Sequence, residues 1–204
     1  MQWQTNLPLI AILRGITPDE ALAHVGAVID AGFDAVEIPL NSPQWEKSIP
    51  QVVDAYGEQA LIGAGTVLQP EQVDRLAAMG CRLIVTPNIQ PEVIRRAVGY
   101  GMTVCRAAPP PAKPSAPWMP VPGAKNFPVI GFWPGLHQSV ESRAAARGSG
   151  LCRWRRDAGK PAQWINAGCV GAGLGSDLYR AGQPVERTAH QAAAFVKAYR
   201  EAVK

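Results

Sequence analysis

One pattern recurs along the chain and constrains its fold: an amphipathic helix ends at a glycine, and a short apolar strand follows within a few residues. The pattern is clear at Gly32, Gly80, Gly101 and Gly168, where glycine suits the left-handed conformation that closes a helix. Strands this short and apolar are typical of buried parallel sheets. The predicted strands are Leu9–Leu13, Ala35–Leu40, Leu61–Ala64, Leu83–Thr86, Thr103–Cys105 and Val170–Leu174.

Helix starts fit between these strands. Thr17 is a good N-cap, Pro18 suits the first helical position, and Glu20 completes a capping box. Further helices are predicted to begin near Pro43, Pro70 and Pro91, and a last one to run from about Val185 to Ala202. Regular alternation of strands and helices indicates a parallel sheet, either a barrel or a doubly wound sheet.

The repeat count favours a barrel. Six strand–helix units are visible, and the stretch between Cys105 and Pro161 has room for two more. We therefore expect an α/β fold, a (β/α)₈ TIM-type barrel in a single domain over 1–204, with strands six and seven disrupted in the sequence.

Composition is that of a soluble globular protein, with 47% hydrophobic and 18% charged residues. The N-terminal residues have no signal-peptide pattern, and no apolar run reaches membrane-spanning length. We therefore expect no membrane partner. The cysteines are widely spread and show no C-x-x-C spacing, which favours free thiols in a reducing cytoplasm and argues against a metal site. They are Cys81, Cys105, Cys152 and Cys169.

The window 106–161 differs from the rest of the chain. It holds nine of the 20 Lys/Arg residues, two of the 16 acidic residues and ten of the 19 prolines. Taken literally, it reads as a disordered, basic, Pro-rich segment. Because the positive charge is concentrated there, the net charge of +4 does not by itself predict nucleic-acid binding.

Polar residues at the predicted strand ends are the candidate site, because barrels build their sites at the carboxyl ends of the strands. Glu37 lies inside an apolar strand, where a carboxylate is costly unless it faces a polar cavity or a structural ion pair. Arg14, Thr66 and Pro87 follow the first, third and fourth strands, and tight-turn chemistry is the alternative for the last two.

The glycine-rich run after the last strand is a candidate phosphate cradle. Gly175 and Ser176 follow Val170–Leu174, and backbone N–H groups at such a turn bind phosphate in many barrels. The histidines His24, His137 and His190 do not cluster, and we predict that they lie at the surface.

Four stretches resemble the motifs of the 2-keto-3-deoxy-6-phosphosugar-acid aldolases: residues 9–15 (LIAILRG), 37–42 (EIPLNS), 63–67 (GAGTV) and 86–88 (TPN). The resemblance covers about 1–105 and 162–204. It implies a class I aldolase, a cytoplasmic homotrimer without metal or cofactor, that releases pyruvate and glyceraldehyde 3-phosphate. The implied substrate has the galacto configuration, with the gluco epimer, or 4-hydroxy-2-oxoglutarate, as the alternative.

The resemblance also implies roles for the candidate residues. Glu37 would shuttle protons, Arg14 and Thr66 would contact the carboxylate end of the substrate, and Gly175 and Ser176 would contact its phosphate. Pro87 would border the substrate. A lysine on the sixth strand would form a Schiff base with the substrate ketone, and Lys125 stands within one position of it.

The window departs from the family pattern, which has L-K-I-F-P at the sixth strand and A-V-G-G-V-T-P-E-N-L at the seventh. Residues 124–128 read A-K-N-F-P, and 151–161 read L-C-R-W-R-R-D-A-G-K-P. Suitable codons for residues 124–134, read one base later, give L-K-I-F-P-S-S-A-F-G, and those for 151–161, followed by G, give S-A-V-G-G-V-T-P-E-N-L. We therefore hypothesise that the reading frame is shifted across 106–161.

Two alternatives stay open. The window can be a genuine insert that replaces two barrel units, in which case we expect a poorly folded chain without aldolase activity. The chain can also be a non-catalytic relative whose basic, Pro-rich segment binds acidic partners or nucleic acid. Salt-dependent nucleic-acid binding would favour that reading, and borohydride trapping with pyruvate would favour the enzyme.

Overall fold

The computed structural model describes residues 6–87, 90–106, 150–153 and 169–203. Within these ranges strands and helices alternate as the repeat pattern predicts. The strands are β1 (Leu9–Ile12), β2 (Ala35–Pro39), β3 (Leu61–Gly65), β4 (Leu83–Thr86), β5 (Thr103–Arg106), β6 (Gly150–Arg153) and β7 (Cys169–Leu174). The helices are α1 (Pro18–Asp30), α2 (Trp45–Tyr56), α3 (Pro70–Ala78), α4 (Pro91–Gly99) and α6 (Val185–Ala202).

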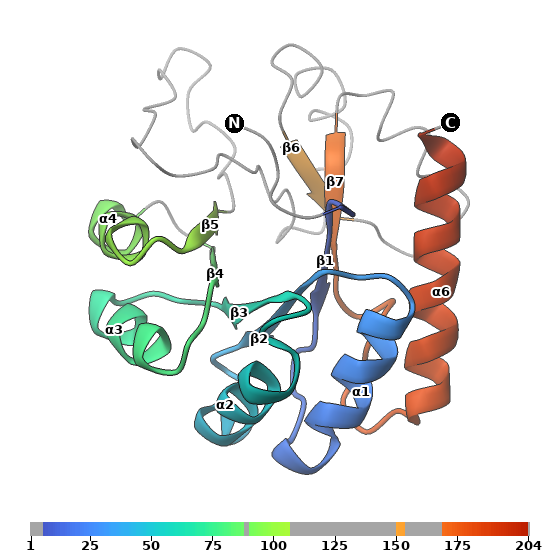
Figure 1. Ribbon diagram of the computed structural model, residues 1–204, viewed down its shortest axis with the longest axis horizontal. Coiled ribbons are helices and arrows are strands. Elements are labelled where there is room, and N and C mark those ends of the chain that lie inside the picture. Colours follow the sequence, from blue (N-terminus) through green and yellow to red (C-terminus); the bar gives the residue numbers. More distant parts are fainter. Residues whose placement is uncertain (1–5, 88–89, 107–149, 154–168, 204) are drawn as a thin grey trace, which may run out of the picture.

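The strands form one parallel sheet in the order β5-β4-β3-β2-β1-β7-β6. The helices lie along the outer side of this sheet, and α6 packs beside α1 (Figure 1). The first and last strand–helix units are therefore neighbours, because β1 pairs with β7 and α1 packs against α6. The described part is a parallel α/β half-barrel.

Side chains alternate between the two faces of the sheet. Val36 and Ile38 point outward and belong to the large core that the strands share with the helices. A smaller cluster of Ile10, Ala35, Leu83 and Cys105 lies on the inner face. Glu37 has the same parity as Ala35, so its carboxylate lies on the inner, concave face.

Three predicted helix ends and the start of α1 are confirmed, whereas α2 begins two residues after Pro43 and Gly168 lies outside the described residues. Gly32, Gly80 and Gly101 have φ values of 109°, 80° and 74°, the left-handed conformation expected for a residue that closes a helix. At the start of α1, the Glu20 carboxylate accepts a hydrogen bond from the Thr17 N–H at 3.2 Å. The local sequence therefore determines where these elements begin and end.

One prediction about the window is wrong. The pattern gave no strand in 106–161, yet β6 pairs in parallel with β7, with an irregularity in register between Gly150 and Leu151. Four residues are too few to show a hydrophobic period, and the neighbouring strand supplies the hydrogen bonds that the pattern could not indicate. None of the helices in the described ranges combines the length and apolarity that a membrane crossing requires.

Candidate active site at the carboxyl ends of the strands

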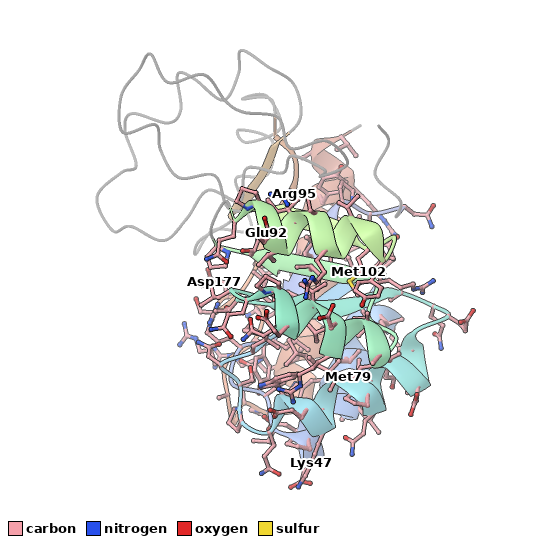
Figure 2. The ribbon with its side chains drawn as sticks, turned by 90° about the vertical axis from the view of Figure 1, so that its left-hand side faces the viewer. Lys47, Met79, Glu92, Arg95, Met102 and Asp177 are labelled. Atoms are coloured by element: carbon pink, nitrogen blue, oxygen red, sulfur yellow. The ribbon has the colours of Figure 1, made fainter. Side chains whose placement is uncertain are left out.

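The candidate residues lie along one rim of the sheet. Pro87, Thr66, Arg14 and Ser176 follow the ends of β4, β3, β1 and β7, and Glu37 lies on β2 between β3 and β1, two residues before the end of that strand. Figure 2 shows Asp177, after β7, and Glu92, at the start of α4, toward one side of the molecule. Met79 and Met102, which precede β4 and β5, lie toward the other side. Lys125 lies outside the described residues.

The positions of β3 that lie next to the Glu37 side chain are glycines. Its neighbours across β3 are Gly63, at the same register position, and Gly65, two residues further on. A Cβ placed on Gly65 would come within 2.5 Å of both carboxylate oxygens of Glu37. The glycine therefore makes room for the carboxylate, and any side chain at this position would displace it.

The environment of Glu37 favours its neutral form. The residue is 2% exposed, and its Oε2 has no hydrogen-bond partner among the described residues. Burial raises the pKa of Glu37 to about 8, against the opposing effect of the Arg14 charge, which lowers it. A carboxyl group with this pKa can both accept and return a proton near neutral pH.

Arg14 is held beside this carboxyl group by the loop after β2. Its Nη1 donates a hydrogen bond of 2.8 Å to Asn41 Oδ1, and the neighbouring Gly15 N–H donates to Ser42 Oγ at 3.0 Å. Sequence reasoning gave Asn41 and Ser42 no role, although both lie in the stretch that resembles the aldolase motif. The positive charge of Arg14 lowers the pKa of Glu37, which shows that the two side chains lie close enough to interact.

Thr66 adopts an unusual backbone conformation at the end of β3. Its φ is 59°, which is rare for a β-branched residue, and it is half-buried directly after Gly65. Such conformations cost on the order of 1–3 kcal/mol and concentrate at functional sites. This conformation distinguishes Thr66 from an ordinary turn residue and is consistent with a role in binding.

The turn after β7 is closed by its own hydrogen bonds. The Gly175 carbonyl accepts from the N–H groups of Leu178 and Tyr179, both at 2.9 Å. Gly175 is buried, whereas Ser176 is exposed and its carbonyl accepts from Arg180 Nε at 3.0 Å. The hydroxyl of Ser176 is therefore accessible at the rim.

The histidine prediction needs one correction. His190 is exposed as predicted, but His24 is 3% exposed and its Nδ1 lies 2.8 Å from Thr188 Oγ1. The surface reading failed because the partner is 164 residues away in the sequence. His137 lies outside the described residues.

Thiols and metal-ligating groups add no further site in the described ranges. Cys81 and Cys105 are buried thiols. No group of three His, Cys, Asp or Glu side chains in that part of the chain has the arrangement of a metal site. Among the candidate site residues that the structure describes, Glu37 is the buried side chain that can carry a proton.

The pKa of Glu37 predicts how stability depends on pH. The pKa of Glu37 is raised above its value of about 4.5 in the unfolded chain. The contribution of the neutral Glu37 carboxyl group to the free energy of unfolding is therefore complete below pH 4.5 and is lost as pH rises through about 8. At pH 9, Glu37→Gln should unfold at a temperature several degrees higher than the parent, because each pKa unit corresponds to about 1.4 kcal/mol. At pH 5 the two proteins should melt together. Melting curves of parent and variant that stay parallel from pH 5 to pH 9 would contradict this environment.

Comparison with known proteins identifies the family. The family model described as KDPG and KHG aldolase matches residues 2–107, more than half of the chain. The 2-dehydro-3-deoxy-6-phosphogalactonate aldolase of Escherichia coli (strain K12) is 68% identical over 208 residues, which cover 100% of both chains.

Two solved structures are similarly close. The one named native KDPGal has a TM-score of 0.85 and 64% identity, and covers 100% of this chain and 99% of that chain. A cube-shaped cage designed by fusing symmetric oligomeric domains has a TM-score of 0.84 and 62% identity, over 98% of this chain and 74% of that chain. With its half-barrel and its buried carboxyl group at the strand ends, the chain belongs to the KDPG and KHG aldolase family, a family of enzymes.

Proposed function

We propose that this protein is a class I aldolase that cleaves 2-dehydro-3-deoxy-6-phosphogalactonate to pyruvate and glyceraldehyde 3-phosphate. The observation that carries the proposal is Glu37, a buried carboxyl group with a pKa near 8 at the carboxyl ends of the strands. The galacto configuration follows the name of the E. coli relative, with 68% identity over both whole chains.

The reaction needs an amine and a proton carrier. A neutral lysine amine adds to the C2 ketone, and loss of water, with a proton supplied by the neutral Glu37 carboxyl group, leaves a protonated imine and the Glu37 carboxylate. The C3–C4 bond then breaks and its electron pair forms an enamine, while Glu37 takes the proton of the C4 hydroxyl and the aldehyde leaves. Glu37 returns this proton to C3, and water hydrolyses the resulting protonated imine to pyruvate and the free lysine, with the released proton restoring the neutral Glu37 carboxyl group.

The remaining candidates have positions that suit the two ends of this substrate. Arg14 and Thr66, beside Glu37, would hold the carboxylate of the substrate, and Pro87 would border it on β4. The turn at Gly175 and Ser176 would hold the phosphate at the other end. Lys125 is the candidate amine in the sequence as it stands, and its placement lies outside the described residues.

The frame-shift hypothesis accounts for the window 106–161. The family match ends at residue 107, one residue after the window begins. The E. coli relative aligns along its entire length over 208 positions, against 204 residues here, so the window replaces a segment of similar length. An insert added to a complete barrel would lengthen the chain, whereas a shifted frame, like a segment that replaces two units, leaves its length nearly unchanged.

Sequencing of the source DNA across codons 100–165 tests this hypothesis directly. We expect that single bases supplied or removed at the ends of the window restore L-K-I-F-P and A-V-G-G-V. We call the product of that corrected gene the frame-restored enzyme. A DNA sequence in which no such correction yields these strands would contradict the hypothesis and favour a genuine insert.

The frame-restored enzyme would be one closed (β/α)₈ barrel over the whole chain, in which β6 is the seventh strand and a sixth strand lies between β5 and β6. Family resemblance supports a cytoplasmic homotrimer, and the designed cage shows that a protein 62% identical to this chain is used as a symmetric oligomeric domain. No metal or cofactor enters the proposed reaction.

The substrate proposal predicts a preference between two epimers. Because they differ only in the orientation of the C4 hydroxyl, whose proton Glu37 would take, we expect kcat/KM to be at least about tenfold higher for the galacto substrate. The measurement is pyruvate release by the frame-restored enzyme with each epimer. Equal values, or a preference for the gluco epimer, would favour a 2-dehydro-3-deoxy-6-phosphogluconate aldolase instead.

A further inference from the structure

A buried polar cluster joins two of the rim loops from outside the proposed site. The loops after β1 and β7 carry Arg14 and Ser176, and their strands are hydrogen-bonded neighbours. Beyond the strand ends the loops still approach closely: a Cβ on Gly15, whose φ is 84°, would lie 3.2 Å from Ala181 Cβ. The residues that follow the turn after β7 therefore pack against the loop that leads into α1.

Tyr179 makes that connection. Its hydroxyl donates a hydrogen bond of 2.6 Å to Glu20 Oε1, and its N–H donates to the Gly175 carbonyl at 2.9 Å. The same Glu20 oxygen accepts the N–H of Thr17 at 3.2 Å. Tyr179 thus links the backbone of the turn after β7 to the first turn of α1.

The other side of Tyr179 is equally constrained. The ring of His24 meets the ring of Tyr179 edge-on, with centroids 5.0 Å apart and an interplanar angle of 78°. Gln183 Nε2 donates to Thr188 Oγ1 at 2.6 Å and to the Leu178 carbonyl at 3.0 Å. Since the Thr188 hydroxyl accepts from Gln183, it is free to donate to His24 Nδ1, which is 2.8 Å away.

Packing alone does not require this arrangement. Tyr179 is 2% exposed, and a phenylalanine would fill the same volume and keep the same ring contact with His24. What the hydroxyl adds is a directed bond to a carboxylate, which is stronger than a bond between neutral groups. Its partner Glu20 lies in the first turn of α1, directly after the loop that carries Arg14, so the bond ties the turn after β7 to the start of that helix.

We propose that Tyr179 is a positioning residue: through Glu20 it holds the turn at Gly175 and Ser176 in the orientation that receives the substrate phosphate. This inference rests on the proposed function, because it assigns the phosphate to that turn. Tyr179 does not touch the substrate. Its contribution is to keep the N–H groups and the hydroxyl of the turn aimed at the rim before the substrate arrives.

Tyr179→Phe tests the proposal, with Tyr56→Phe as the matched control. Tyr56 also donates its hydroxyl to α1, at 3.1 Å from the Leu22 carbonyl, but it lies on α2, which packs against α1, β2 and β3. In the synthetic direction, the frame-restored enzyme joins pyruvate to glyceraldehyde 3-phosphate or to unphosphorylated glyceraldehyde. We expect Tyr179→Phe to raise KM for the phosphorylated aldehyde about tenfold and to leave kcat/KM for glyceraldehyde within about twofold.

A second readout needs no catalysis. In the full 204-residue chain, Tyr179→Phe should accelerate amide hydrogen exchange at residues 176–178 at least about threefold, and Tyr56→Phe should not. Unchanged exchange, or a KM effect that is equal for both aldehydes or for both variants, would overturn the positioning role. An inactive frame-restored parent would refute the proposed function instead, and the exchange experiment would still decide whether Tyr179 orders the turn.

Discussion

Restoring the reading frame across 106–161 is expected to raise aldolase activity by on the order of 10³-fold or more over the 204-residue chain. The reason is chemical: the described rim supplies the proton carrier Glu37, but the electron sink needs a lysine amine aimed at the substrate ketone. In the sequence as it stands, Lys125 is followed by Asn126-Phe127-Pro128, which lacks the apolar strand pattern that would aim it. The measurement is pyruvate release from the galacto substrate by both proteins.

The control for this comparison is the frame-restored enzyme with the lysine of its L-K-I-F-P strand changed to methionine. This variant keeps the length and apolar stem of the side chain but removes the amine, so activity should return to the level of the 204-residue chain. Equal activity of the 204-residue chain and the frame-restored enzyme would show that the window contributes nothing to catalysis.

Glu37→Gln in the frame-restored enzyme is expected to lower kcat by about 10²–10⁴-fold, the range that general acid–base groups contribute. Glutamine is nearly isosteric and fits over Gly65, so the loss reports the missing proton transfer. The parent should also show an ionisation near pH 8 in its kcat profile, from the raised pKa of Glu37, and the variant should lack it. Steady-state kinetics from pH 5 to pH 10 make both comparisons.

Glu46→Gln is the matched control for that experiment. Glu46 lies on α2, half-exposed in an ion pair of 3.5 Å with Arg75, away from the inner face of the sheet. Its replacement should leave kcat unchanged, since exposed ion pairs contribute little. A similar loss in both variants, or full activity in Glu37→Gln, would remove Glu37 from the reaction.

The sequence predicted the elements well because their signals are local. Glycines with positive φ end the helices where the pattern placed them, and β4 has the predicted bounds Leu83–Thr86. Glu37 could be selected for the same reason, since a carboxylate between Val36 and Ile38 is costly wherever the strand is buried. Neither inference needs knowledge of residues far away in the chain.

The contacts that organise the rim join residues that are far apart in the sequence. Tyr179 meets Glu20 across 159 residues, and Arg14 meets Asn41 across 27. No periodicity indicates such pairs, so His24 was wrongly placed at the surface and Tyr179 received no role. The backbone conformation of Thr66 could not be predicted either, because β-branched residues disfavour the left-handed conformation that it adopts.

Borohydride trapping with pyruvate tests the Schiff-base mechanism most directly. Reduction of the imine would leave a carboxyethyl group on the lysine amine, and mass spectrometry of the peptides locates it. The frame-restored enzyme should carry one such group per chain, on the lysine of L-K-I-F-P, and its methionine variant should carry none. Failure to trap pyruvate in an otherwise folded enzyme, or a label on a different residue, would contradict the assignment of this protein as a class I aldolase.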